Sequence, residues 1–244
     1  MQQDVEYGHL IGLRLAELVL QQAGPVFTAE EAIRAGESLG ISPAYARRLL
    51  SRLASGGLLR RLKGGLYCTD GILEQSSGHP HDFAIATKIV QPSAISHESA
   101  LHHWGLIDQV PMRVTASTPK SFVTPSMRQA TRGKAADVGH DWVIDGVRYH
   151  YVRVAPEAMF GVQQEWVDAT ARVPMFDRER ALLDVFAYRR IGASELGVEI
   201  LALHSDDVDL DRLVAYAEQL DRPLLLKRVR AAAGAAKSGM GTRG

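Results

Sequence analysis

Residues 28–55 carry closely spaced start and stop signals for helices, and these constrain the fold more than any other feature. Thr28 and Glu31 have the spacing of a capping box, which predicts a short helix that begins after Thr28 and ends near Gly40. Ser42-Pro43 then places a hydroxyl N-cap before a proline at the first helical position. An apolar pattern over residues 10–19 predicts a further helix before both. The region is therefore expected to be a small helical unit with tight turns.

The helix that begins at Ser42 divides into an apolar face and a basic face. The apolar positions recur at helical spacing and predict the side that packs on the core. Gly56-Gly57 predicts the end of the helix. The opposite face carries Arg47, Arg48, Ser51, Arg52 and Ser55.

A basic hairpin is predicted directly after this helix. Segments 58–63 and 66–69 have the composition of strands and are joined through Gly64-Gly65. Helix, helix, turn, helix and hairpin is the order of a winged helix-turn-helix, in which one helix enters the major groove of DNA and the hairpin meets the flanking backbone. Arginine suits both contacts, because its planar fork matches guanine edges and phosphate oxygens. We expect a DNA-binding domain over residues 1–77 that contacts DNA through Ser42, Arg47, Arg48, Ser51, Arg52, Arg60, Arg61 and Lys63.

The alternative is an amphipathic helix whose arginines are merely solvated, beside an ordinary hairpin. The distribution of charge favours the DNA-binding interpretation. Lys plus Arg equals Asp plus Glu, at 28 each, yet no acidic residue lies between Glu37 and Asp70. A polyanion would meet no repelling carboxylate from this stretch.

A second acid-free window spans residues 109–136 and includes a Ser/Thr-rich segment, 117–134, that is expected to be a loop. We expect it to extend the nucleic-acid surface or to contact an acidic partner, and a solvated loop is the alternative. Residues 194–221 have the opposite bias, with eight acidic residues against Arg212, and their role stays open. The candidate second basic surface consists of Lys120, Arg128, Arg132 and Lys134.

Residues 82–230 predict a mixed α+β domain, so that the fold class of the whole chain is α+β. Asp145-Gly146 is the strongest hairpin signal in the chain and joins two strand-like segments. Helices are expected over residues 177–188, 195–203 and 211–220. A linker near residues 78–81 separates this domain from the first. The Ala/Gly-rich residues 231–244 are expected to be a flexible tail.

The usual catalytic and metal-binding patterns are not met. His97 and His102 are five residues apart and therefore lack the i, i+4 spacing of a zinc-protease helix. Asp177, Glu179 and Asp184 are better explained by a helix start and by an i, i+4 pair of Arg180 with Asp184. No P-loop, GxGxxG or GxSxG pattern is present. We expect no enzyme, no cofactor and no metal.

The composition is that of a globular protein, with 46% hydrophobic and 23% charged residues. The apolar stretch 10–20 is broken by Arg14 and Glu17, so neither a membrane span nor a signal peptide is expected. A single cysteine, Cys68, cannot form an internal disulfide. These features predict a cytoplasmic protein without a membrane partner.

The last sequence feature is a set of three segments, 96–106, 114–120 and 173–184. In their order and spacing they resemble the AbiEi-type antitoxins of bacterial type IV toxin–antitoxin systems, and the likeness extends over about residues 5–230. The resemblance implies an N-terminal winged helix that binds operator DNA and represses its own operon. It also implies a C-terminal domain that counteracts a nucleotidyltransferase-like toxin without forming a stable complex.

A second class of function stays open. In this alternative the winged helix only targets the protein to DNA, and the C-terminal domain is a protein-interaction or enzymatic domain without antitoxin activity. A nucleotidyltransferase-like reading frame next to the gene would favour the antitoxin.

Overall fold

The computed structural model describes residues 2–69, 80–125, 127, 141–187 and 193–240. The chain is mixed α+β and forms two compact units, residues 1–91 with 166–173 and residues 92–165 with 174–244. Among the described residues, every helix is too short or too polar to cross a lipid bilayer.

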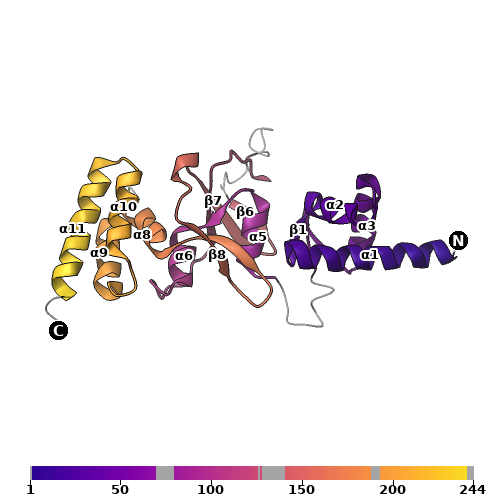
Figure 1. The fold of residues 1–244 in the computed structure, drawn as a ribbon, viewed down its shortest axis with the longest axis horizontal. Coiled ribbons are helices and arrows are strands. Elements are labelled where there is room, and N and C mark those ends of the chain that lie inside the picture. Colours follow the sequence, from indigo (N-terminus) through magenta and orange to yellow (C-terminus); the bar gives the residue numbers. More distant parts are fainter. Residues whose placement is uncertain (1, 70–79, 126, 128–140, 188–192, 241–244) are drawn as a thin grey trace. The chain divides into compact units, whose positions relative to one another are not determined.

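The first unit combines helices with a small antiparallel sheet whose strand order is β1-β3-β2 (Figure 1). The hairpin of β2 and β3 is present as predicted, and β1 pairs with β3 along its other edge. The elements are α1 (Gln2–Ala23), β1 (Val26–Thr28), α2 (Ala29–Glu37), α3 (Pro43–Ser55), β2 (Arg60–Lys63), β3 (Leu66–Cys68) and α5 (Asp82–Ile89).

Local capping chemistry sets the starts of α2 and α3. The backbone N–H of Glu31 donates to Thr28 Oγ1 at 3.2 Å, and Glu31 Oε2 accepts from the backbone N–H of Thr28 at 2.8 Å, so the capping box is confirmed. Ser42 Oγ accepts from the backbone N–H of Tyr45, with Pro43 at the first helical position. After α3, Gly57 adopts a φ of 76°, which turns the chain toward the hairpin.

The hydrophobic core of this unit lies where α1, α2 and α3 meet the small sheet. The apolar face of α3 is buried there, as the periodicity predicts. Phe27 of β1 and Tyr67 of β3 stack with ring centroids 6.0 Å apart. The buried side chains include Leu15, Val19, Phe27, Leu49, Leu50, Leu53 and Leu59.

The boundary between the units differs from the sequence-based expectation. The first unit extends to Gln91 and includes α5, which the sequence placed in the second domain. Lys88 of α5 forms an ion pair with Glu31, and α5 packs near β1, which explains its membership of the first unit. Of the predicted linker at residues 78–81, residues 78 and 79 lie outside the described residues, and His81 is the N-cap of α5.

Glu31 links the stability of the first unit to pH. Burial raises its pKa, but the Lys88 ammonium and the Thr28 N–H lower it by more, so that the pKa lies below its usual value of 4.5. A carboxyl with a lowered folded-state pKa stabilises the protein above its unfolded pKa, and this contribution disappears as pH falls through the folded value. We expect Glu31→Gln to reduce the free energy of unfolding by about 1 kcal/mol at neutral pH, because it removes the charge that pairs with Lys88.

The difference between Glu31→Gln and the wild type should shrink as pH falls below 4.5, in denaturant titrations followed by circular dichroism. Glu30→Gln is the matched control, because Glu30 is exposed in the same helical turn. Equal stability of Glu31→Gln and wild type at neutral pH would contradict a stabilising role for the Glu31 carboxylate.

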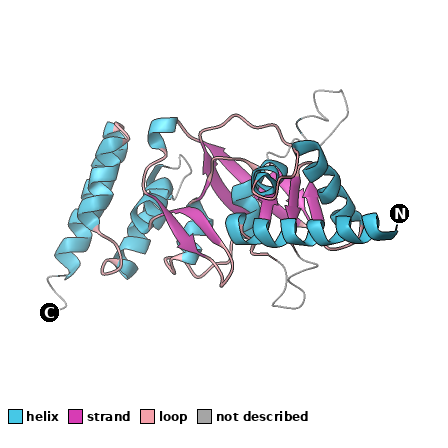
Figure 2. Ribbon diagram, turned by 45° about the vertical axis from the view of Figure 1, so that its right-hand side comes forward, coloured by secondary structure: helices cyan, strands magenta, loops and turns pink. Residues whose placement is uncertain are grey.

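The second unit is built on a six-stranded mixed sheet with the strand order β6-β7-β5-β4-β9-β8, drawn in magenta in Figure 2. β5 runs parallel to β7, and β4 runs parallel to β9, whereas β4 is antiparallel to β5. The strands are β4 (Ala94–Ile95), β5 (Val114–Thr118), β6 (Asp141–Ile144), β7 (Val147–Arg153), β8 (Val162–Trp166) and β9 (Arg172–Phe176).

The Asp145-Gly146 hairpin is confirmed. Both residues have positive φ, 52° and 82°, as a tight turn between twisted antiparallel strands requires. The turn pairs β6 with β7 in the register Ile144↔Val147. The expected loop at residues 117–134 begins later than predicted, because Ser117 and Thr118 are buried at the end of β5.

Helices complete the second unit, and Figure 1 shows α9, α10 and α11 side by side beyond α8. Polar contacts join α8 to α10, since the Tyr216 hydroxyl donates to Asp177 Oδ2 and the Asp209 N–H donates to Glu179 Oε1, each at 2.8 Å. The helical elements are α6 (His97–His103), the 3₁₀ turn η1 (Pro156–Ala158), α8 (Arg178–Ala187), α9 (Ala193–His204), α10 (Leu210–Gln219) and α11 (Pro223–Met240).

The expectation of a flexible tail from residue 231 is wrong as far as Met240, because α11 continues to that residue. Ala232 and Ala233 are buried, at 5% and 3% exposure, and α11 packs on α9 and α10. Alanine has the highest helix propensity, and its small side chain lets neighbouring helices approach closely. The Ala/Gly-rich composition that predicts a flexible tail therefore forms a packed helix as far as Met240.

Candidate nucleic-acid interface

The polar face of α3 is exposed as the sequence predicts. Arg47, Arg48, Ser51 and Arg52 all point away from the core, on the opposite side from Leu49, Leu50 and Leu53. The Arg48 guanidinium lies 5.5 Å from the centre of the Tyr45 ring. This contact limits the motion of Arg48 while its N–H groups stay available.

Arg47 and Arg52 form no ion pair with any acidic residue in the described part of the chain. An unpaired guanidinium has no partner to lose when it binds a phosphate or a base edge, so its hydrogen-bonding capacity is fully available. The arrangement can therefore bind a polyanion along one side of α3.

The two serines of the predicted site differ in their present roles. Ser42 is exposed, but its Oγ already accepts from the Tyr45 N–H at 3.3 Å and caps α3. Ser51 is exposed, and its backbone carbonyl accepts from the Ser55 hydroxyl at 2.9 Å. Of the two, Ser51 has the side chain that is free of a structural hydrogen bond.

The predicted hairpin residues lie on β2, an edge strand of the small sheet. Arg61 is exposed, and its Nε–H donates to the Lys63 carbonyl at 3.4 Å, which bends the side chain along the strand. Arg60 and Lys63 are half-buried, and each makes an interaction within the protein. Register shifts between Arg61 and Lys63, and this bulge increases the local twist of the hairpin. Arg61 is thus the most accessible of the three.

The candidate second basic surface is described only in part. Lys120 is exposed, and its backbone N–H donates to Thr118 Oγ1 at 3.2 Å. Arg128, Arg132 and Lys134 lie outside the described residues. The role of this surface stays a prediction.

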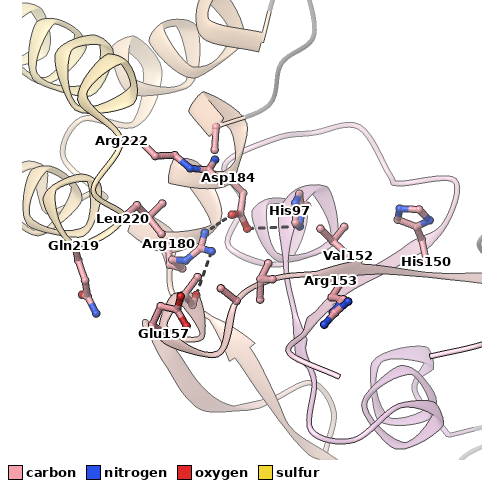
Figure 3. Close-up of a pocket in the computed structure, with 14 residues that line it drawn as sticks. His97, His150, Val152, Arg153, Glu157, Arg180, Asp184, Gln219, Leu220 and Arg222 are labelled. Atoms are coloured by element: carbon pink, nitrogen blue, oxygen red, sulfur yellow. Dashed lines mark hydrogen bonds and ion pairs between the residues drawn. The ribbon is translucent and has the colours of Figure 1, made fainter. Parts of the chain in front are cut away.

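A buried polar network in the second unit was only partly anticipated. The predicted pair of Arg180 and Asp184 is present and almost fully buried, at 2% and 6% exposure. Arg180 also lies over the rings of Phe176 and Phe160, at 4.4 and 5.2 Å, and donates to the Ala158 carbonyl. Figure 3 shows this pair beside His97, whose Nδ1 is 3.5 Å from Asp184 Oδ2.

His97 joins the network to the sheet. Its Nδ1 lies 2.8 Å from Ser96 Oγ, which accepts from the Ser117 hydroxyl of β5 at 3.0 Å. His97 is buried, whereas His102 is half-buried further along α6, so the two do not converge on one point. Among the described residues, no group of three or more His, Cys, Asp or Glu side chains could hold a metal ion.

Sequence reasoning missed the grouping of this network, although it found the Arg180–Asp184 spacing. The signal for the pair is local, since residues i and i+4 share a helix face. The proximity of His97 depends on packing between segments more than 80 positions apart. Such a contact leaves no pattern in the chain.

Comparisons with known proteins support the fold alone. No family model matches the chain, and no curated protein matches it. Among solved structures, the chain is similar to the RV2827C protein from Mycobacterium tuberculosis, with a TM-score of 0.50 and 16% sequence identity. The match covers 91% of this chain and 75% of that one. The chain therefore shares an overall α+β arrangement with this mycobacterial protein.

Proposed function

We propose that the protein is a sequence-specific DNA-binding regulator whose first unit is a winged helix-turn-helix. The observation that carries this proposal is the exposed, unpaired basic face of α3, capped by Ser42 and followed by a basic hairpin. In such a unit α3 is the recognition helix and the β2–β3 hairpin is the wing.

The chemistry of α3 supports the proposal. The major groove is wide enough for one helix, and bidentate contacts from arginine to guanine are the commonest specific contacts there. Arg47, Arg48 and Arg52 project from a helix whose other face is anchored in the core, so their base contacts would be held in a fixed geometry. Arg61 on the hairpin adds a cation for the flanking backbone.

The resemblance to AbiEi-type antitoxins supports a finer proposal. In it, the protein represses its own operon and its second unit counteracts a nucleotidyltransferase-like toxin without a stable complex. The two activities would then depend on different units of the chain.

The direct test is fluorescence anisotropy of the full chain with duplex DNA from its own promoter and with a scrambled duplex of equal length. Specific binding should exceed binding to the scrambled duplex by at least a factor of about 10³. The observed affinity should fall steeply with salt, because bound phosphates release counterions. Equal affinity for the two duplexes would overturn the proposal of a sequence-specific regulator.

The antitoxin proposal has its own test. This proposal predicts a nucleotidyltransferase-like reading frame beside the gene. The full chain is co-expressed with the product of that reading frame, and growth is measured. Arg48→Ala/Arg52→Ala should still rescue growth, because the proposed antitoxin activity lies in the second unit. Growth arrest in the presence of the wild-type chain would overturn this finer proposal and leave the DNA-binding proposal intact.

The second basic surface predicts a measurable part of the salt dependence. Each phosphate contact adds about 0.9 to the magnitude of the slope of log K against log salt concentration. Replacing Lys120, Arg128, Arg132 and Lys134 with Ala should flatten this slope by roughly one to three units. Thermal stability should change little, because the exposed charge of Lys120 contributes little to folding and the sequence predicts a solvated loop for the other three residues. An unchanged slope together with unchanged toxin rescue means that the segment is a solvated loop.

A further inference from the structure

The second unit contains an open cavity of about 670 Å³ that the proposed DNA-binding function does not use. Its size falls in the range of pockets that hold small molecules. The walls come from the end of β7, η1, α8 and the turn between α10 and α11, and the lining residues are drawn in Figure 3.

The floor of the cavity is the buried pair of Arg180 and Asp184. Phe176, Phe160 and the Ala158 carbonyl hold the Arg180 guanidinium in place. Among the described residues, Arg180 Nε and Asp184 Oδ2 are buried and have no hydrogen-bond partner. Both atoms are closed off from solvent, and Asp184 Oδ2 faces His97 Nδ1 at 3.5 Å, so the pair gives the cavity a fixed floor.

The rim carries cations without partners. Arg153 and Arg222 line the cavity and are exposed, and neither is paired with an acidic side chain in the described part of the chain. With Arg180 they make three guanidinium groups against the two carboxylates of Glu157 and Asp184. The cavity therefore has a positive excess, and guanidinium groups bind phosphate oxygens in a bidentate geometry.

Other lining groups are polar. Burial lowers the pKa of His150 below its usual value of 6.5, against the opposing effect of the hydrogen bond between its Nδ1 and Asp141 Oδ1. Gln219 and Glu157 are exposed on the wall. These side chains offer donors and acceptors that suit hydroxyl groups.

Backbone conformation at the cavity is unusual as well. The described residues include three non-glycine residues with positive φ, and one of them, Asp145, belongs to the β6–β7 turn. The other two are His97, which lines the cavity, and Asp221, which lies between the lining residues Leu220 and Arg222. Left-handed backbone at such residues is costly and concentrates at functional sites.

We propose that this cavity binds a small phosphate ester that carries hydroxyl groups, with the phosphate on one of the two rim arginines, Arg153 or Arg222, and the hydroxyl groups on the polar wall. Its occupant belongs to the class of sugar phosphates and nucleotides. The site lies within the second unit and is independent of the basic face of α3.

The test is isothermal titration calorimetry of the full chain with ribose 5-phosphate, glucose 6-phosphate and AMP. Each is compared with ribose, glucose or adenosine, and with inorganic phosphate. At least one ester should bind at least tenfold more tightly than both its dephosphorylated counterpart and inorganic phosphate. Arg153→Ala or Arg222→Ala should weaken that binding at least tenfold, and both side chains are exposed, so the fold should be retained.

Arg228→Ala is the matched control, because Arg228 is exposed on α11 and does not line the cavity. It should leave binding of the ester unchanged. Three results would overturn the proposal: no ester binds at millimolar concentration, both rim variants bind like the wild type, or the control variant weakens binding as much as they do.

Discussion

Arg48→Ala/Arg52→Ala should abolish specific binding to promoter DNA while the first unit stays folded. Each lost bidentate base contact costs about 1–3 kcal/mol, so the double variant should lose roughly 2–6 kcal/mol if both contacts are to bases. Both side chains are exposed, and no core contact is removed. Anisotropy titrations at several salt concentrations measure the loss, and circular dichroism checks the fold.

The salt series separates two kinds of contact. Loss of base contacts reduces specific binding and leaves binding to the scrambled duplex nearly unchanged. Loss of phosphate contacts weakens binding to both duplexes and flattens the salt slope by about 1 for each contact. Either pattern places α3 at the DNA.

Lys227→Ala/Arg228→Ala is the matched control for net charge. These residues are exposed on α11 in the second unit, and their removal lowers the charge of the chain by the same amount. The control should bind promoter DNA like the wild type. An α3 double variant that binds as tightly as this control would refute the assignment of α3 as the recognition helix.

The elements that sequence predicts well are those set by local chemistry. The capping box at Thr28, the Ser42-Pro43 start and the Asp145-Gly146 turn each depend on residues within four positions of one another. The exposed arginines of α3 were predictable for the same reason, because helical periodicity assigns each side chain to a face. The candidate DNA-binding face can therefore be predicted from the sequence.

The missed elements depend on distant partners. β1 has only three residues, and it is a strand because it pairs with β3 about forty positions later in the chain. β8 lacks the buried apolar positions that mark a strand in a sequence, since Val162, Gln163 and Gln164 are all exposed. It lies at the edge of the large sheet. The cavity could not be predicted from the sequence, because its lining residues come from separate segments between His97 and Arg222. No local pattern specifies such a grouping.

Asp184→Ala should be among the most destabilising single substitutions in the second unit. It leaves the Arg180 guanidinium buried, at 2% exposure, without its carboxylate partner. Breaking a buried ion pair in this way costs about 3–5 kcal/mol, because the remaining charge stays desolvated. The free energy of unfolding from urea titrations of the full chain measures the effect.

Replacing both partners should recover most of this loss. In Arg180→Met/Asp184→Leu neither charge of the pair is left in the interior, and apolar side chains of similar volume take the place of the pair. The introduced thioether would also keep contact with the aromatic rings of Phe160 and Phe176, which now hold the guanidinium. Recovery would show that the cost of Asp184→Ala comes from an uncompensated charge and not from a lost contact.

An exposed ion pair in the same unit provides the comparison. Lys237 Nζ lies 2.6 Å from Asp211 Oδ1, with the two side chains 53% and 88% exposed. Asp211→Ala should change stability by less than about 1 kcal/mol, since water solvates the remaining charge and screens the pair. If Asp184→Ala were as mild as Asp211→Ala, water would already reach the Arg180 guanidinium, and the floor of the cavity would not be the dry polar network that the geometry indicates.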